Sequence, residues 1–164
     1  MKRLYLVGGT MGVGKTTACQ ALERMLPRAA MLDGDWLWDA DPFVVTDETK
    51  AMVLDNIRHV LGNLLRCSEY DNVIFCWVMH EQQIIDDVLS ALDLSGCEVV
   101  AVSLTCSPGE LARRIQDDVD RGAREPDVLD RSLARLPLYE VLRTQRLDVT
   151  GLSPEETARA LSRM

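Results

Sequence analysis

The stretch GTMGVGKT at residues 9–16 decides the fold. It matches the pattern G-x-x-x-x-G-K-[ST] at every fixed position and adds a further glycine at Gly12. In such a loop backbone N–H groups bind phosphate oxygens, which come close enough only where side chains are nearly absent. We expect Lys15 to reach the β- and γ-phosphates and Thr16 to place its hydroxyl on Mg²⁺. The stretch therefore predicts a binding loop for a nucleoside triphosphate.

The residues on either side agree with this prediction. Residues 4–7, LYLV, form an apolar run of buried-strand length, and residues 16–26 show a helical pattern that Pro27 stops. The N-terminus of that helix would direct free N–H groups and the positive end of its dipole at the anion. A glycine-rich turn without a ligand is the alternative. The residues expected to contact the nucleotide are Gly9, Met11, Gly12, Val13, Gly14, Lys15, Thr16 and Thr17.

Length and hydropathy fit one soluble domain. A chain of 164 residues can bury about 70% of its unfolded surface, so we expect residues 1–164 to form a single domain. The apolar runs are far shorter than the roughly 20 residues of a membrane span. The sequence starts directly with a strand rather than a signal peptide. We therefore expect a cytoplasmic protein with no membrane contact.

Charge and cysteine spacing argue against a nucleic-acid partner and against a metal site built from cysteines. The net charge of −8 does not favour a nucleic acid, because binding a phosphate backbone requires a concentrated basic face. The five cysteines form no C-x-x-C pair, and neither of the two histidines has ligand spacing to a cysteine. We interpret the cysteines as reduced core residues.

Strand-like and helix-like segments alternate along the whole chain. Thr46, Ser107 and Ser153 are expected N-caps, and the latter two open capping boxes with Glu110 and Glu156. The alternation predicts an α/β fold with a largely parallel sheet, helices on both faces and a ligand at the carboxyl ends of the strands. The expected strands are 4–7, 29–32, 73–78, 99–104 and 147–149, and the expected helices are 16–26, 47–67, 84–92, 108–119, 127–135 and one from residue 154.

Two carboxylates follow the second expected strand. Asp33 and Asp35 alternate along an extended segment, so that both can reach the crevice beside the first strand. One can hold Mg²⁺ through its waters, and the other can accept a proton from an incoming hydroxyl. Asp-Gly-Asp is also an ordinary tight turn, and that alternative stays open. Beside a phosphate loop we favour the functional interpretation.

Arginines flank a break in the helical pattern at about residues 121–127. A glycine hinge between permanent cations suits a lid that closes over a triphosphate, excludes water and stabilises charge during transfer. The alternative is a solvated helical face with ion pairs, such as Arg113 with Asp117 and Arg114 with Asp118. The arginines around the break are Arg114, Arg121, Arg124, Arg131 and Arg135.

The order of these pieces resembles the small P-loop kinases of the shikimate kinase, gluconate kinase and adenylate kinase kind. The resemblance covers nearly the whole chain. It implies a three-layer P-loop NTPase fold with a five-stranded parallel sheet that holds ATP and Mg²⁺. It also implies an inserted, helical acceptor-binding section at about residues 36–70 and a short lid. The pieces that carry it are GTMGVGKT, LDGD at 32–35, RRI at 113–115, RLPLYE at 135–140 and LDVTGLSPEE at 147–156.

The resemblance also implies roles for single residues. Arg114 would pack on adenine, and Gly151 and Leu152 would line the base. Arg124 would touch the phosphates, with Arg121 in reserve. The roles of the remaining residues concern the transfer itself: Asp33 would assist the metal together with Thr16, Asp35 would contact or deprotonate the acceptor hydroxyl, and Arg135 would face the transferring phosphoryl group.

The chain departs from the family after its third expected strand. That strand ends in Met79-His80-Glu81, without the aspartate that many P-loop enzymes use as a second metal carboxylate. Metal binding must therefore rely on Thr16 and Asp33, with Glu81 as a possible helper. His80 is a candidate acceptor contact because of its place at a strand's carboxyl end, and a packed or solvated histidine is the alternative.

The acceptor section is acidic and aromatic. From Asp33 to Asp71 there are nine acids against one lysine and two arginines, whereas a site for a nucleoside monophosphate or a dicarboxylate would need arginines. We expect a neutral or cationic acceptor that bears a hydroxyl. Alternatively, the tryptophans are core residues and the acids face water. The candidate acceptor residues are Asp35, Trp36, Trp38, Phe43, Arg58 and His80.

These observations predict an ATP-dependent phosphotransferase, monomeric or homodimeric, that acts on a small-molecule hydroxyl. Asp35 is the expected base, and Lys15, Arg124 and Arg135 are the expected stabilisers of charge. A nucleoside monophosphate kinase-like enzyme is one alternative. A switch module that binds ATP without an acceptor is the other.

Overall fold

A computed structural model describes all 164 residues and contains one five-stranded sheet. Every strand pair is parallel, and the spatial order is β2-β3-β1-β4-β5. The chain therefore crosses from one side of the central strand β1 to the other after β3, and ligands of open α/β sheets bind at such a crossing. The strands are β1 (Lys2–Gly8), β2 (Ala29–Asp33), β3 (Asn72–Cys76), β4 (Cys97–Thr105) and β5 (Gln145–Asp148).

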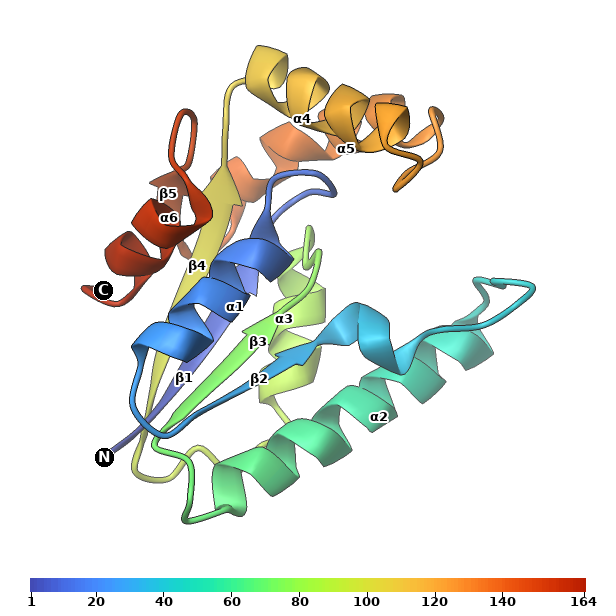
Figure 1. Cartoon of the computed structure of the whole chain (residues 1–164). Helices are drawn as coiled ribbons and strands as arrows, with labels where there is room; N and C mark the ends of the chain where they lie inside the picture. Colours follow the sequence, from blue (N-terminus) through green and yellow to red (C-terminus); the bar gives the residue numbers. More distant parts are fainter.

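Helices cover both faces of the sheet (Figure 1). On one face α1 packs against α6, and on the other α2 packs against α3. The pair α4 and α5 lies at the carboxyl end of the sheet, above the loop that follows β1. The helices are α1 (Lys15–Met25), α2 (Asp47–Arg66), α3 (Gln82–Leu89), α4 (Pro108–Asp120), α5 (Val128–Arg135) and α6 (Pro154–Leu161), with 3₁₀ turns at Gly34–Leu37 and Leu136–Val141.

The central strand β1 shows why the sequence folds into three layers. Tyr5 and Val7 belong to the core on the α1 and α6 face, whereas Leu4 and Leu6 belong to the core on the α2 and α3 face. All four side chains are at most 1% exposed. A strand covered on both faces has no polar alternation, which explains the unbroken run LYLV. The expected three-layer fold with a five-stranded parallel sheet is confirmed.

Local signals set several helix ends where the sequence predicts them. The Thr46 hydroxyl accepts the backbone N–H of Thr49 and caps α2. At α6 the capping box is complete, because Ser153 and Glu156 each bond the other's backbone N–H. Each such cap stabilises a helix by about 1 kcal/mol.

The expected capping box of α4 is incomplete, and one of the two ion pairs of the alternative interpretation is absent. Ser107 caps the helix by accepting from the Glu110 backbone, but the Glu110 carboxylate does not return to Ser107. It is occupied by Arg113 and Arg114, at 2.9 and 2.7 Å. Arg114 therefore pairs with Glu110 rather than with Asp118, while the predicted pair of Arg113 with Asp117 is present at 2.7 Å. The Ser107 N–H donates instead to the Thr150 hydroxyl at 2.9 Å, so the capping box is only half formed.

The end of β3 also differs from the expectation. The strand stops at Cys76 instead of continuing to Val78. The Val78 carbonyl accepts the Gly9 N–H at 3.2 Å and the Tyr139 hydroxyl at 2.6 Å. The segment after β3 thus leaves the sheet ladder to support the glycine-rich loop and the turn at Leu136–Val141.

Two compositional expectations can be compared with the structure. All five cysteines are free thiols, and Cys19, Cys76 and Cys106 are buried, which agrees with reduced core residues. None of the helices combines the length and the apolar character that crossing a bilayer requires.

Candidate active site

The glycine-rich loop between β1 and α1 is packed against α4. Gly12 adopts a left-handed φ of 86°, and a Cβ at this position would lie 2.5 Å from the Ile115 side chain. Gly14, with φ 97°, occupies the N-cap of α1 without any side-chain cap. The first N–H groups of α1 are therefore left for a ligand, because nothing in the loop caps them.

Lys15 is half-buried at the start of α1. Its Nζ donates to the carbonyl of Thr10, within the same loop, at 3.0 Å. Burial lowers the pKa of the Lys15 ammonium, and the positive charge of Arg124 acts in the same direction, while Asp33 and Asp35 oppose it. A polyanion in the loop would oppose this shift and favour the charged form, because opposite charge offsets desolvation.

Thr16 and Asp33 form a pair of oxygen donors. The Thr16 hydroxyl donates to Asp33 Oδ2 at 2.7 Å, and Asp33 is only 5% exposed. Hard oxygen ligands of this kind fit Mg²⁺, which usually takes one or two protein oxygens and fills its octahedron with water and phosphate. The structure contains no group of three or more histidines, cysteines and acids that could hold a metal ion.

Asp35 is oriented by a residue of the neighbouring strand's end. The Trp77 indole Nε1 donates to Asp35 Oδ1 at 3.1 Å, and the Asp35 backbone N–H donates to Asp33 Oδ1 at 2.9 Å. A Cβ on Gly34 would lie 2.6 Å from the Trp77 ring, so glycine is the residue that fits there. Burial raises the pKa of the Asp35 carboxyl, as does the charge of Asp33, while Lys15 and the Trp77 bond lower it.

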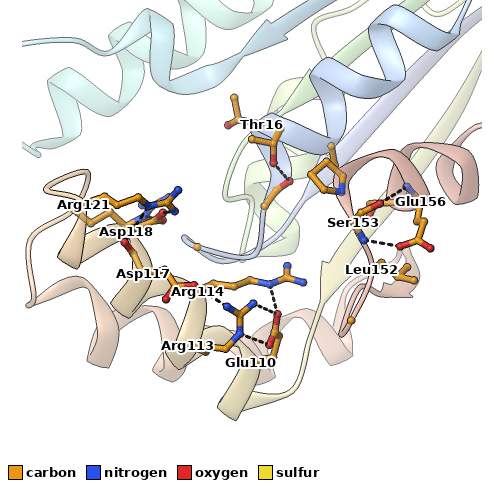
Figure 2. Close-up of a pocket in the computed structure, with 18 residues that line it drawn as sticks. Thr16, Glu110, Arg113, Arg114, Asp117, Asp118, Arg121, Leu152, Ser153 and Glu156 are labelled. Carbon is orange, nitrogen blue, oxygen red and sulfur yellow. Dashed lines mark hydrogen bonds and ion pairs between the residues drawn. The ribbon is translucent and has the colours of Figure 1, made fainter.

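A first cavity, of about 580 Å³, lies between α1, α4 and the start of α6. We call it the arginine-lined pocket. Figure 2 shows Arg113 and Arg114 converging on Glu110, and Ser153 with Glu156 on another wall. Residues that define it include Gly12, Gly14, Thr16, Thr17, Arg114, Arg121, Arg124, Gly151 and Leu152.

Arg114 is fixed in this pocket by three separate elements. Its guanidinium donates to Glu110, to the Val13 carbonyl of the glycine-rich loop at 2.8 Å and to the Val149 carbonyl at 2.9 Å. With its donors occupied at the edge, the guanidinium keeps its flat face for stacking. This is the geometry that a base-packing arginine needs.

The segment between α4 and α5 is held by one carboxylate. Asp118 accepts from Arg121 at 2.9 Å through Oδ1 and from Arg124 at 2.9 Å through Oδ2. Both arginines line the arginine-lined pocket, and the Arg121 side chain is 72% exposed. Phosphate oxygens entering the pocket would compete with Asp118 for these two cations.

A second cavity, of about 570 Å³, lies on the other side of the glycine-rich loop, which contributes Met11. We call it the aromatic pocket. Arg131 and Arg135 of α5 line it and have no ion-pair or hydrogen-bond partner. Burial and the charge of Arg135 lower the pKa of His80, whose buried Nδ1 is also unpartnered. Residues that define this pocket include Asp35, Trp38, Phe43, Val45, Trp77, His80, Glu81 and Arg135.

Most of the sequence-predicted site residues line one of the two cavities. Six line neither: Gly9, Val13, Lys15 and Asp33, which lie in or beside the glycine-rich loop, and Trp36 and Arg58. Trp36 is 53% exposed and does not line the aromatic pocket. Arg58, on α2, donates to the Asp87 carbonyl at 2.9 Å and fastens α2 to α3. For both positions the structure offers a role in packing or at the surface.

Sequence reasoning missed Trp77 and Arg131. In the sequence Trp77 belongs to an expected strand and shows no sign of a site role. Its hydrogen bond to Asp35 arises only because β2 and β3 are neighbours in the sheet. Gly34 carried a signal, because a glycine between two functional acids indicates something large packed against it. Arg131 was noted among the lid arginines without a site of its own.

Fold and site together define a class, the P-loop NTPase fold with a glycine-rich phosphate loop after a central parallel strand. Residues 6–133 match the family model described as AAA domain, so the chain belongs to this family. No curated protein shows a significant match to the sequence.

Solved structures agree with the fold across nearly the whole chain. A gluconokinase from Sinorhizobium meliloti 1021 is 22% identical, with a TM-score of 0.66 over 97% of this chain and 91% of its own. A sugar kinase from Janibacter is 17% identical, with a TM-score of 0.72 over 99% and 94%. An APS kinase from Mycobacterium tuberculosis, solved with AMPPNP and APS, is 16% identical, with a TM-score of 0.67 over 99% and 96%. The resemblance to small P-loop kinases is confirmed at the level of the fold.

Proposed function

We propose that the protein transfers the γ-phosphoryl group of Mg·ATP to a hydroxyl of a small molecule. One observation carries this proposal. The glycine-rich loop lines two cavities at once, and the carboxylate of Asp35 lines the second of them. A nucleotide bound on one side therefore has a candidate base for an acceptor on the other side. The kinases among the similar structures support it.

The nucleotide would occupy the arginine-lined pocket. Its base would stack on Arg114 near Gly151 and Leu152, and its phosphates would lie in the loop against Lys15. Arg121 and Arg124 would exchange Asp118 for phosphate oxygens, which brings the segment at about residues 121–127 down as a lid.

Mg²⁺ would be held by Thr16 and Asp33, and when bound there it neutralises charge on phosphate oxygens. The Thr16 hydroxyl, which now donates to Asp33, would turn a lone pair toward the ion. Asp33 would keep its second oxygen on the Asp35 backbone N–H, so the metal site and the base are joined by one carboxylate.

Asp35 would act on the acceptor. Its carboxylate takes the proton of the acceptor hydroxyl, the acceptor oxygen bonds the γ-phosphorus, and the bond from that phosphorus to its bridging oxygen breaks to release ADP. Lys15, Arg124 and Arg135 stabilise the charge spread over the transferring group. Trp77 holds Asp35 Oδ1 and leaves the other carboxylate oxygen for the hydroxyl.

The charges of the aromatic pocket support a neutral or cationic acceptor. Among its lining residues Asp35, Glu81 and Asp87 balance three cations, and one of these, Arg135, is reserved for the phosphoryl group. An anionic acceptor would need further arginines for bidentate contacts. We also propose that residues 36–70 form the acceptor-binding section of a single domain, which works as a monomer or homodimer in the cytoplasm.

The test is an ADP-release assay with Mg·ATP and a panel of metabolite alcohols. A kinase shows acceptor-dependent ADP release that Asp35→Asn abolishes. Slow ATP hydrolysis that no acceptor stimulates and that Asp35→Asn leaves unchanged would instead identify a nucleotide-dependent switch.

A further inference from the structure

The aromatic pocket is apolar over most of its surface. Ten of its 18 lining residues are hydrophobic. On the α2 side Val53 and Leu54 line it, on the α3 side Ile84, and its floor includes Met79. A sugar, a sugar acid or a nucleoside monophosphate needs hydrogen-bond partners along its whole length, and these side chains offer none.

The rim of the pocket is apolar as well and exposed. Phe43 and Val45 line the opening and are 58% and 56% exposed. Phe43 leans on Trp38, with ring centroids 4.8 Å apart and planes tilted by 50°. Large exposed apolar side chains at a pocket mouth are covered when a ligand of matching chemistry binds.

Eight polar or charged residues complete the lining, and three of them bear on the reaction. Asp35, held by Trp77, lies beside the glycine-rich loop together with His80 and the unpartnered Arg135. A ligand matched to this pocket has one polar end that carries the reacting hydroxyl and an apolar body that extends toward Phe43. A cavity of about 570 Å³ has room for a body of two fused rings or more.

We propose that the phosphoryl acceptor is an alcohol with an uncharged, apolar and aromatic body, bound between Trp38, Phe43 and Ile84 with its hydroxyl at Asp35. This inference rests on the proposed function and adds the chemical class of its substrate. Water is excluded from the transfer by the apolar body itself, which reduces wasteful hydrolysis of ATP.

The test measures binding to protein saturated with Mg·AMPPNP, after calorimetry has shown that the analogue binds. The probe is 2-(naphthalen-2-yl)ethanol, and gluconate and AMP are the polar comparators. We expect the naphthyl alcohol to bind and the two comparators to bind at least roughly tenfold more weakly.

Two adjacent valines provide a matched control. Val45 lines the pocket, whereas Val44 is 46% exposed and does not. We expect Val45→Ser to lower the affinity for the naphthyl alcohol roughly threefold and Phe43→Ser to lower it roughly fivefold. Val44→Ser should leave this affinity unchanged.

Tighter binding of gluconate or AMP would overturn the inference. So would a nucleotide-bound protein that rejects the naphthyl alcohol, or equal effects of Val44→Ser and Val45→Ser; these outcomes leave the proposed function standing. Folded protein that fails to bind Mg·AMPPNP would overturn the proposed function, and this inference with it.

Discussion

The two cavities beside the glycine-rich loop have nearly the same volume, about 580 and 570 Å³, and opposite chemistry. Two of the 18 residues that line the arginine-lined pocket are hydrophobic, compared with ten of the 18 that line the aromatic pocket. The first is built for charge, and the second for an apolar body with a carboxylate at one end. Under the proposed function, the first cavity handles phosphate and the second selects the acceptor.

The strongest test of this division compares two lysines, one in the glycine-rich loop and one in the aromatic pocket. Lys15→Met removes the cation at the phosphates, and we expect ADP release to fall at least roughly 10³-fold. Lys50 lines the aromatic pocket, and Lys50→Met should leave the affinity for Mg·AMPPNP unchanged. Calorimetry and the ADP assay check both variants. Equal loss of nucleotide affinity in the two would break the division.

Asp35→Asn changes a residue of the aromatic pocket alone. The amide keeps the shape of the side chain but cannot take the acceptor proton, so acceptor-dependent transfer should fall roughly 10²- to 10³-fold. Affinity for Mg·AMPPNP should stay within about twofold, since Asp35 does not line the arginine-lined pocket. A variant that keeps the full transfer rate would remove Asp35 from the mechanism.

Arg135→Ala tests whether a cation of the aromatic pocket takes part in the transfer. Arg135 lines the aromatic pocket, and its side chain has no partner in the protein, so its loss should not lower stability. We expect kcat to fall roughly 10²-fold, because the variant removes a cation that stabilises the transferring group. The control is Arg143→Ala, because Arg143 is 72% exposed, pairs with Asp86 and lies outside both cavities. Single-turnover kinetics and thermal unfolding measure the two effects. Similar rates for the two variants would contradict the role of Arg135.

Gly34→Ala tests the support of the aromatic side. The new Cβ would lie 2.6 Å from the Trp77 ring, so the ring must move, at a cost of about 1–3 kcal/mol in the free energy of unfolding. Transfer should slow as Asp35 loses its hydrogen bond. Gly109→Ala is the control, because nothing lies within 4 Å of a Cβ there. Denaturant unfolding distinguishes them, and equal stability of both variants would show that Trp77 is free to shift.

Glu110→Gln gives the smallest effect and concerns the arginine-lined pocket. Hydrogen bonds from Arg113 and Arg114 lower the pKa of Glu110 to about 2. A depressed folded-state pKa stabilises the protein above the unfolded value of about 4.5, and this contribution is lost as the pH falls toward 2. The stability difference between wild type and Glu110→Gln should therefore shrink over that range. A difference that does not change with pH would contradict the pairing.

The same division explains how much could be predicted from the sequence. The arginine-lined pocket is built from local signals. The glycine-rich loop, the capping box at Ser153 and the arginines near residue 121 each show their chemistry within a few residues. Asp33 and Thr16 were also found, since each follows a strand of the expected sheet, and their bond of 2.7 Å is a direct consequence of that placement.

The aromatic pocket could not be predicted in this way. Its walls come from the loop after β1, the segment before α2, α2 itself, the end of β3, α3 and α5. Val53 and Ile84 look in sequence like ordinary core positions of amphipathic helices, and Trp77 looks like part of a buried strand. In the sequence, aromatic character alone marks Trp36, Trp38 and Phe43 as candidates. Which of them faces the pocket depends on the 3₁₀ turn at Gly34–Leu37, which the sequence does not reveal. Pocket lining of this kind is a property of packing between distant segments.

The measurement that tests the central claim most directly is a calorimetric titration of the folded protein with Mg·AMPPNP. The account predicts saturable binding of one nucleotide per chain, lost in Lys15→Met, because the uncapped N–H groups at the start of α1 and the half-buried ammonium of Lys15 favour a polyanion. A titration without heat at two temperatures, from protein with native helical content, would contradict it.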